Sequence, residues 1–390
     1  MTADNHLVLL TKFVAAREKK PRWALFALKS EVAALLPENR VSICFHHRLP
    51  ERENVEIWYN AELAKATYRG LMKCGQVWLC PVCAQRLAAI RRETLKTAIQ
   101  NASDKFFPVM VTYTVQHHAG QSLSYLLDKM NAAYRRMRQQ RLWRVYKEEW
   151  LIEGETRAVE ITYGANGWHP HYHVILWLKL EILDYMKDDN GEYRIGNLQD
   201  GLFKHLAPLW VESLQAFQLT GLTDRALNIR PGWKELNEYM TKNGTILPDN
   251  GAKWGLAEEA TMGQFKKAHE EGKTPWDLLI ESFCGHAPSG ELFKEYAAST
   301  KGKSSLQWTP GLKAALGVDI DEDKAICLDE ENEADILLWT LDVEQWRAVV
   351  NTGAVGILLD KASTGDPEQV KALLIEVNRR NETENYNPIA

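Results

Sequence analysis

Alternating polar and apolar residues mark two adjacent segments near the middle of the chain. Residues 169–178, HPHYHVILWL, place histidines at every second position before an apolar run, and residues 158–163, AVEITY, precede them. Because successive side chains of a strand point to opposite faces, both segments are typical of strands with one buried face. GANG at residues 164–167 is strong turn chemistry. The pattern predicts a β-hairpin whose second strand presents three histidines on one face.

Other segments predict strands and helices in alternation. Residues 106–118, FFPVMVTYTVQHH, are rich in β-branched and aromatic residues and predict another strand. Residues 84–102 have the spacing of an amphipathic helix. Its predicted inner face carries Leu87, Ile90, Leu95 and Ile99, and its outer face carries Arg86, Arg91, Arg92 and Lys96. This basic outer face is either a phosphate-binding element or simply solvated. A further helix is predicted from Asp366, a capping residue, and Pro367 at the first turn.

One helical pattern combines arginines with aromatic residues. The arginines are Arg135, Arg136, Arg138, Arg141 and Arg144, and the aromatic residues interleaved with them are Tyr134, Trp143 and Tyr146. Bases stack on aromatic rings and phosphates pair with cations, so the pattern favours single-stranded nucleic acid. The alternative is that about half of these arginines are simply solvated.

Length and composition indicate a globular protein of two or three units. The chain has 390 residues, of which 45% are hydrophobic and 25% charged. No apolar run approaches the roughly 20 residues of a membrane span, and the first residues lack the apolar segment of a signal peptide. We therefore expect a cytoplasmic location, where the six cysteines are metal ligands or buried thiols rather than disulfides.

Charge is distributed unevenly along the chain. The net charge is −5, but residues 318–390 contain 17 acidic and six basic residues, a net of −11, which leaves +6 for residues 1–317. A mildly basic body is compatible with a nucleic-acid partner. We expect three regions: an N-terminal helical region with a zinc knuckle at residues 1–103, a central domain at residues 104–317, and an acidic C-terminal region at residues 318–390.

Four cysteines near the N-terminus have the spacing of metal ligands: Cys44, Cys74, Cys80 and Cys83. The last two form the sequence CPVC, in which the proline bends the backbone so that two thiolates reach one ion. We expect zinc here. His46 and His47 are rivals of Cys44 for the place of the fourth ligand. A redox C-x-x-C motif is the alternative, and it is disfavoured because no βαβ pattern surrounds it.

The predicted hairpin gathers candidate ligands for a second metal. With residues 165 and 166 at its tip, Glu160 pairs with His171, and His173 lies one step away on the diagonal. One carboxylate and two imidazoles with open positions suit a divalent ion that also binds a substrate. The alternative of ordinary structural histidines is weaker for three of them at a period of two, facing a glutamate.

Residues 230–244, RPGWKELNEYMTKNG, predict a helix with its own start and stop signals. On this helix Glu235, Tyr239 and Lys242 lie at positions i, i+4 and i+7, within an arc of about 60°. A carboxylate, a phenol and an ammonium on one stripe form a candidate catalytic group. Spacing alone leaves open an ordinary salt-bridged helix face with a half-buried tyrosine.

Taken together, these elements resemble the plasmid rolling-circle replication initiators of the HUH endonuclease superfamily that have a single catalytic tyrosine. The resemblance spans roughly residues 70–317 and follows the order CGQVWLCPVCAQR, VTYTVQHH, EITYGANGWHPHYHVIL, KELNEYMTKNG and TKGKSSLQWTPGLK. HPHYHV followed by a tyrosine helix with a lysine three residues on is a highly specific combination. The resemblance implies an α+β fold with a central antiparallel sheet flanked by helices, between the zinc-knuckle region and the acidic C-terminal region.

The resemblance also implies roles for individual residues. His171 and His173 would be the HUH pair that binds Mg²⁺ or Mn²⁺ together with Glu160, and His169 lies outside this pair. Tyr239 would be the nucleophile, with Lys242 as its accompanying lysine, and Glu235 would activate water. The implied reaction is strand-specific nicking and joining of origin DNA through a 5′-phosphotyrosyl link that leaves a 3′-hydroxyl.

The implied partners are single-stranded or hairpin origin DNA, a host helicase and a polymerase, without a membrane. One alternative keeps the chemistry and changes the biology: a transposase or a conjugative relaxase, although relaxases usually have a three-histidine metal site. Another alternative is a zinc-containing DNA-binding regulator without nuclease activity, in which the histidines are structural.

Overall fold

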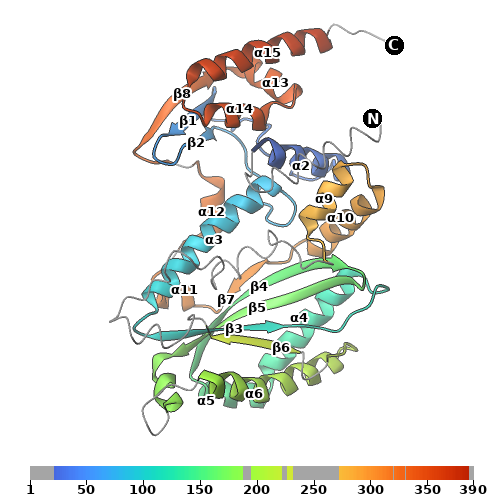
Figure 1. Cartoon of the computed structure of the whole chain (residues 1–390), viewed down its shortest axis with the longest axis vertical. Coiled ribbons are helices and arrows are strands. Elements are labelled where there is room, and N and C mark those ends of the chain that lie inside the picture. Colours follow the sequence, from blue (N-terminus) through green and yellow to red (C-terminus); the bar gives the residue numbers. More distant parts are fainter. Residues whose placement is uncertain are drawn as a thin grey trace. The chain divides into compact units, whose positions relative to one another are not determined.

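The computed structural model describes residues 22–187, 195–221, 226–231, 272–318, 320–329 and 331–385. The chain divides into two units. Unit 1 combines Met1–Leu87, Leu278–Lys294 and Asp321–Ala390, and unit 2 combines Ala88–Asp277 and Glu295–Ile320. Each unit contains its own β-sheet with helices around it (Figure 1).

Unit 2 contains a five-stranded antiparallel sheet in the order β6-β3-β5-β4-β7. Its strands are β3 (Phe106–Tyr113), β4 (Ile152–Gly164), β5 (Gly167–Lys179), β6 (Leu227–Pro231) and β7 (Leu306–Trp308). The two long central strands β4 and β5 form the predicted hairpin, with Gly164 paired to Gly167. Gly167 has a φ of 84°, and a Cβ there would lie 2.9 Å from the Cα of Ala119. Both the turn and this close approach therefore require glycine.

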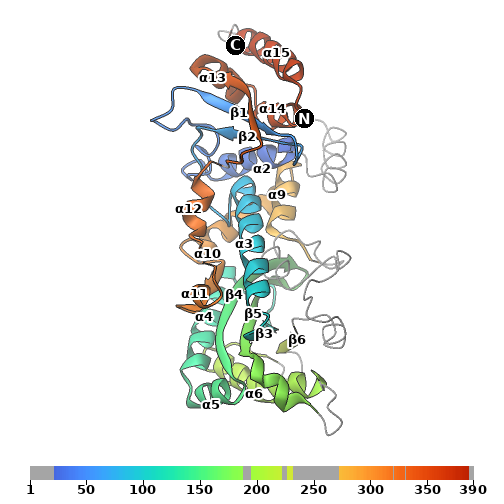
Figure 2. The same ribbon diagram turned by 90° about the vertical axis from the view of Figure 1, so that its left-hand side faces the viewer.

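Helices cover one face of this sheet: α4 (Leu123–Gln139), α5 (Arg141–Glu149) and α6 (Ile195–Gln215), with a short 3₁₀ helix η1 (Leu180–Met186) after β5 (Figure 2). Tyr134 of α4 packs edge-on against Tyr113 and Tyr172, with ring centroids 5.5 Å apart in both pairs. Tyr134 and Trp143 are both buried. The interpretation that these two rings stack on bases is therefore wrong, because both rings are buried in the protein and are not accessible to a base.

The opposite face of the sheet packs against α3 (Pro81–Asn101), from Ala88 onward, and against α11 (Leu312–Ala315). Leu95, Ala98 and Ala102 lie in the same apolar cluster as Met110 and Ile175 of the sheet. The apolar stripe is thus rotated from the predicted one, because small alanines occupy the inner positions while Ile90 and Ile99 are half-buried. Of the four predicted outward residues, Lys96 is exposed, whereas Arg86, Arg91 and Arg92 are half-buried.

Unit 1 contains a three-stranded antiparallel sheet in the order β2-β1-β8. Its strands are β1 (Val55–Asn60), β2 (Lys65–Arg69) and β8 (Asp335–Leu341). Its helices are α2 (Arg22–Leu35), α12 (Glu322–Cys327), α13 (Val343–Asn351), α14 (Val355–Ala362) and α15 (Pro367–Asn385), and α9 (Pro275–Phe283) and α10 (Ala287–Thr300) contribute to it in part. The N-terminal and C-terminal parts of the chain therefore share one unit, whereas the sequence pattern treated them as separate regions.

Long-range contacts hold the two ends of the chain together in unit 1. The carboxylate of Asp360 on α14 accepts hydrogen bonds from the backbone N–H groups of Arg22 and Trp23, each at 3.0 Å, so it caps the first turn of α2. The hydroxyl of Tyr68 on β2 donates to the carbonyl of Val355 at 2.8 Å. The predicted α+β fold, with antiparallel sheets flanked by helices, is confirmed, and so is the helix that begins at Pro367.

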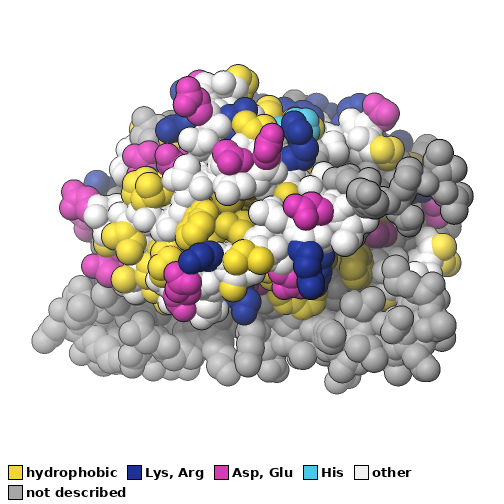
Figure 3. Space-filling model, turned by 90° about the horizontal axis from the view of Figure 1, so that it is seen from above, with side chains coloured by type: hydrophobic (Ala, Val, Ile, Leu, Met, Phe, Trp, Pro, Cys, Tyr) yellow, Lys and Arg dark blue, Asp and Glu magenta, His cyan; other side chains and the backbone are white. Residues whose placement is uncertain are grey.

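The face of unit 1 seen from above in Figure 3 carries a central group of apolar side chains with charged side chains around them. Acidic side chains on this face are scattered among basic ones, so they form no continuous acidic field there. Across the described ranges, none of the helices combines the length and the apolar character that crossing a membrane demands.

Candidate metal centres and catalytic face

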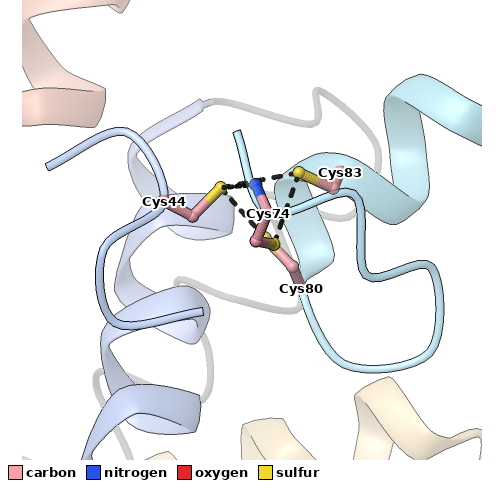
Figure 4. Close-up of side chains that lie close together, drawn as sticks. All are labelled: Cys44, Cys74, Cys80 and Cys83. Carbon is pink, nitrogen blue, oxygen red and sulfur yellow. Dashed lines mark hydrogen bonds between the residues drawn. The ribbon is translucent and has the colours of Figure 1, made fainter. Parts of the chain in front are cut away.

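The four predicted cysteines of unit 1 form one buried group (Figure 4). The Sγ atom of Cys44 lies 3.5 Å from that of Cys83 and 3.8 Å from that of Cys80, and the Sγ atoms of Cys74 and Cys83 are 3.7 Å apart. Thiolates at a zinc–sulfur distance of about 2.3 Å occupy the corners of a tetrahedron with edges of about 3.8 Å. A disulfide would need about 2.05 Å. The group could therefore bind zinc.

Cys44, rather than His46 or His47, completes this group. The backbone N–H of Cys74 donates to the Sγ of Cys44 at 3.3 Å, which fixes two ligands relative to each other. Hydrogen bonds from Cys44, Cys74 and Cys80 hold the pKa of the Cys83 thiol well below its usual range. Burial raises the pKa of Cys80, and the hydrogen bond with Cys44 raises that of Cys74. The geometry therefore favours the thiolate, the form that binds a metal, at Cys83.

A buried ammonium lies beside the cysteines. Lys29 of α2 is fully buried, and its Nζ donates to the carbonyl of Cys44 at 2.6 Å. Burial lowers the pKa of Lys29, while the neighbouring cysteines, Cys44 first, raise it. A zinc ion with four thiolates carries a net negative charge, and a buried charge requires a partner. Lys29 is placed to offset that charge.

The C-terminal part of unit 1 is attached to the segment around the cysteines. Lys73 forms a buried ion pair with Asp329, with Nζ 2.6 Å from Oδ1. The other oxygen of Asp329 accepts from the backbone N–H of Gly70 at 3.0 Å, and Arg86 donates to the carbonyl of Leu328 at 2.5 Å. Asp329, like Asp360, is thus an acidic residue of the C-terminal region with a structural partner inside unit 1.

The histidine hairpin of unit 2 has the register that its turn predicts. Glu160 pairs with His171, and Thr112 of β3 pairs with His173, so these side chains share the sheet face opposite α4 and α6. The Nε2 of His173 lies 2.5 Å from the Oε2 of Glu160, and both side chains are largely buried. The Oγ1 of Thr112 lies 3.1 Å from the Nδ1 of the same ring. The imidazole of His173 is therefore held from both sides.

His171 lies next to two further imidazoles. Its Nε2 is 2.8 Å from the Nε2 of His169, and the ring of His169 in turn lies against that of His117, with centroids 4.3 Å apart. Burial first, and then the neighbouring imidazoles, lower the pKa of His171 to about 3 and that of His169 to about 4. Near neutral pH these rings are uncharged, so their nitrogen lone pairs are available to a divalent ion.

The donor types on this face fit a divalent ion, although the side chains are arranged as two pairs. Among the described residues, the four cysteines are the one group of three or more candidate ligands whose donor atoms all lie within 4.8 Å of one another. Glu160 and His173 are in contact, while His171 is turned toward His169. Within the described structure, Glu160, His171 and His173 therefore do not form a group of this kind.

Two neighbours of this group were not singled out by the sequence pattern. Thr112 follows from the alternation of residues 106–118, which places it on one face of β3, but its pairing with His173 depends on the strand order. His117 lies beyond the end of β3, where the chain forms a bridge between Gln116 and Thr220. No local sequence pattern indicated that His117 would lie near His169.

Glu235, Tyr239 and Lys242, the predicted catalytic residues of the helix at residues 230–244, lie outside the described residues.

The arginine-rich helices lie on the other face of the sheet from the histidines. Arg138 pairs with the buried carboxylate of Glu155 at 3.0 Å, and Arg136 pairs with Glu212 at 3.4 Å. Arg135, Arg141 and Arg144 are exposed. Two of the five arginines therefore have ion-pair roles within the fold.

Comparisons with known proteins give two kinds of match. Residues 70–193, which include the CPVC cysteines and the histidine hairpin, match the family described as "Replication protein". The chain is 26% identical over 312 residues to "Protein rep" of Streptomyces lividans, and the match covers 67% of each protein. It is 32% identical over 133 residues to "Neomycin resistance protein" of Streptomyces cyanogenus, covering 27% of this chain and 30% of that one. No solved structure matches.

These matches support the recognition drawn from the motifs at the level of a plasmid replication initiator. The family match covers the cysteine segment from residue 70, the strand β3 and the whole β4–β5 hairpin, and it ends before the predicted tyrosine helix.

Proposed function

We propose that this protein initiates rolling-circle replication of a plasmid by nicking one DNA strand at the origin and later rejoining it. The observation that carries the proposal is the contact between Glu160 and His173, on the hairpin that lies within the stretch matching the replication family. A carboxylate and an imidazole that are both largely buried are costly to desolvate, and such pairs are enriched at binding and catalytic sites.

The proposed metal ligands are the two imidazoles and the carboxylate of this face. Glu160, His171 and His173 would hold Mg²⁺ or Mn²⁺, and Thr112 would orient the ring of His173 through its Nδ1. The ion, when bound, would polarise the scissile phosphate and favour the ionised phenol. The four cysteines of unit 1 would hold a structural zinc.

Tyr239 is the proposed nucleophile. Its phenolate oxygen would attack the phosphorus, form a 5′-phosphotyrosyl bond and displace the 3′-oxygen, which takes up a proton to become a 3′-hydroxyl primer. The ammonium of Lys242 would stabilise the phenolate. Because the covalent link conserves the energy of the phosphodiester bond, rejoining needs no nucleotide cofactor. The second cleavage after one round of replication would use water activated by Glu235.

The attachment of the chain supports this assignment. Pro231 pairs with Val109 of β3, and Lys273 forms a bridge with Tyr163 of β4, so the intervening segment begins and ends at the unit 2 sheet. Eight residues separate Pro231 from Tyr239, a span of up to about 27 Å. Val109 is three residues, or about 10 Å along the strand, from Thr112 beside the histidines. The tyrosine is therefore within chain reach of the proposed metal ligands.

Covalent capture tests the proposal. Single-stranded 30-mers tiled across the replicon that carries the gene are incubated with the full chain and Mn²⁺, and we expect one tile to give a protein–DNA adduct that survives denaturing electrophoresis. A non-catalytic DNA-binding regulator would bind a tile without forming an adduct, and that result on every tile would end the nuclease proposal. A nick at a hairpin origin of a circular plasmid, rather than at a mobile-element end or a transfer origin, separates replication from transposition and conjugation.

His173→Ala is expected to lower the nicking rate at least about a hundredfold, because a metal that polarises the phosphate contributes several kcal/mol. His169→Ala is the matched control: it removes an imidazole from the same strand face but leaves the Glu160–His173 contact in place. We expect it to remain within a few-fold of the wild type in single-turnover assays across a Mn²⁺ titration. The reverse order of the two variants would assign the metal to the His169–His171 pair instead.

A further inference from the structure

Arg91 lies on the side of α3 that faces the histidine-bearing surface of the unit 2 sheet. Leu95 and Ala98 of α3 pack against that surface, in the cluster that contains Met110 and Ile175. Arg91 precedes Leu95 by four residues, so it continues the same stripe by one helical turn. Its side chain is therefore directed toward the sheet, and the residue is half-buried.

The hydrogen bond of Arg91 to Ser305 places the guanidinium at the same height along the sheet as the proposed metal ligands. Its guanidinium donates to the Oγ of Ser305 at 2.7 Å, and the carbonyl of Ser305 accepts from the backbone N–H of Val159 at 3.0 Å. Val159 lies directly between Ala158, which pairs with His173, and Glu160, which contacts it. The guanidinium is thus held beside the strand segment that carries the carboxylate.

The lengths of α3 and β3 independently place Arg91 at the same height along the sheet as the proposed metal ligands. The end of α3 is attached to the start of β3, because the N–H of Phe106 donates to the carbonyl of Ala102 at 2.8 Å. From Ala102 back to Arg91 a helix rises about 17 Å. From Phe106 to Val111 a strand also rises about 17 Å, which ends beside Thr112.

We propose that Arg91, oriented by Ser305, binds a phosphodiester group of single-stranded DNA at this face. The inference rests on the proposed function, which supplies the substrate class, and it assigns a phosphate contact to one arginine on the side of α3 that faces the sheet. A guanidinium presents a planar fork that matches two phosphate oxygens, and a partly buried position strengthens the pairing. The hydroxyl of Ser305 fixes the plane of that fork toward the Glu160 segment.

The test is salt-dependent binding of a fluorescein-labelled single-stranded 30-mer that carries the nicked site, or dT30 if no tile is nicked, measured by anisotropy without added Mn²⁺. Arg91→Gln should weaken binding about ten- to a hundredfold and reduce the slope of log K against log salt by about 0.7, the value for one phosphate contact to a single strand. Arg91→Lys should restore the slope but only part of the affinity, because the charge remains and the fork is lost. The matched control is Arg92→Gln, since Arg92 is the next residue of α3 and lies 3.5 Å from Glu93.

A scan of single methylphosphonate substitutions separates direct contact from a structural role. In the wild type one neutral linkage should weaken binding, and in Arg91→Gln the same linkage should have no further effect. A slope equal to that of the wild type, or full additivity of linkage and substitution, would overturn the assignment. If Arg91→Gln does not fold, Ser305→Ala replaces it in the scan, with partial loss of the same linkage effect expected.

The outcomes for Arg91 and for nicking are independent. If the wild type forms no adduct but its binding to dT30 depends on Arg91, the nuclease proposal fails and the phosphate contact stands. If the wild type nicks and Arg91→Gln binds with an unchanged slope, the nuclease proposal stands and Arg91 is a structural link between α3 and the Ser305 loop.

Discussion

Tyr239→Phe is expected to abolish the covalent protein–DNA adduct, a loss of more than about a thousandfold in single-turnover nicking, while single-stranded binding stays within a few-fold of the wild type. The phenyl ring keeps the shape and apolar area of tyrosine but lacks the oxygen that forms the bond to phosphorus. Removal of a nucleophile costs far more than removal of a group that only supports it. The measurement is adduct formation on denaturing gels, together with anisotropy of the same oligonucleotide.

The matched control is Tyr185→Phe. Tyr185 lies in η1 of unit 2 and is 79% exposed, so its hydroxyl is accessible to DNA in solution. We expect its adduct yield to equal that of the wild type. An undiminished adduct from Tyr239→Phe would transfer the nucleophile to another tyrosine and would remove the reason for assigning roles to Lys242 and Glu235.

The register of the hairpin could be predicted because two local signals agree on it. A slip of one residue would turn every side chain of β5 to the other face, so the apolar alternation allows one pairing, and the glycine turn fixes the same one. The result is the observed pairing of Glu160 with His171. The cysteine group was predictable for a similar reason, since metal ligands must converge and CPVC supplies two of them on one turn.

The sheet of unit 1 could not be predicted in the same way. Strand β1 pairs with β8, and Val55 faces Leu341, so the partners are far apart in the sequence. Local periodicity gives the type of an element but not its partner, and the long connection between them contains all of unit 2. The C-terminal region was defined by its charge, yet the ion pair between Lys73 and Asp329 joins it to the cysteine segment.

The position of Arg91 shows a second limit of pattern reasoning. On α3 the larger apolar residues suggested one inner face, but alanines at 88 and 98 allow closer packing on a slightly rotated face. An arginine predicted for the outer face then lies on the side toward the sheet. Helix faces with several small residues are ambiguous in this way, because either neighbouring stripe can be buried.

Cys80→Ser is expected to remove about one zinc per chain and to unfold unit 1. The cysteines lie in the turns after α2, in the segment after β2 and at the start of α3, so the metal would join three segments of unit 1. Structural zinc contributes about 10–16 kcal/mol of apparent binding free energy, which is comparable with the whole stability of a domain. Elemental analysis and thermal unfolding of the purified chain measure both effects.

Cys284→Ser is the matched control, because Cys284 is a partly exposed cysteine of unit 1 outside the group. It should keep its zinc and its melting temperature. Loss of zinc from Cys80→Ser without a change in the unfolding of unit 1 would mean that Lys29 and the Asp329 contacts suffice to hold the segments together. Zinc retained at full occupancy by Cys80→Ser would contradict the four-thiolate site itself, since a hydroxyl is a poor replacement for a thiolate ligand of zinc.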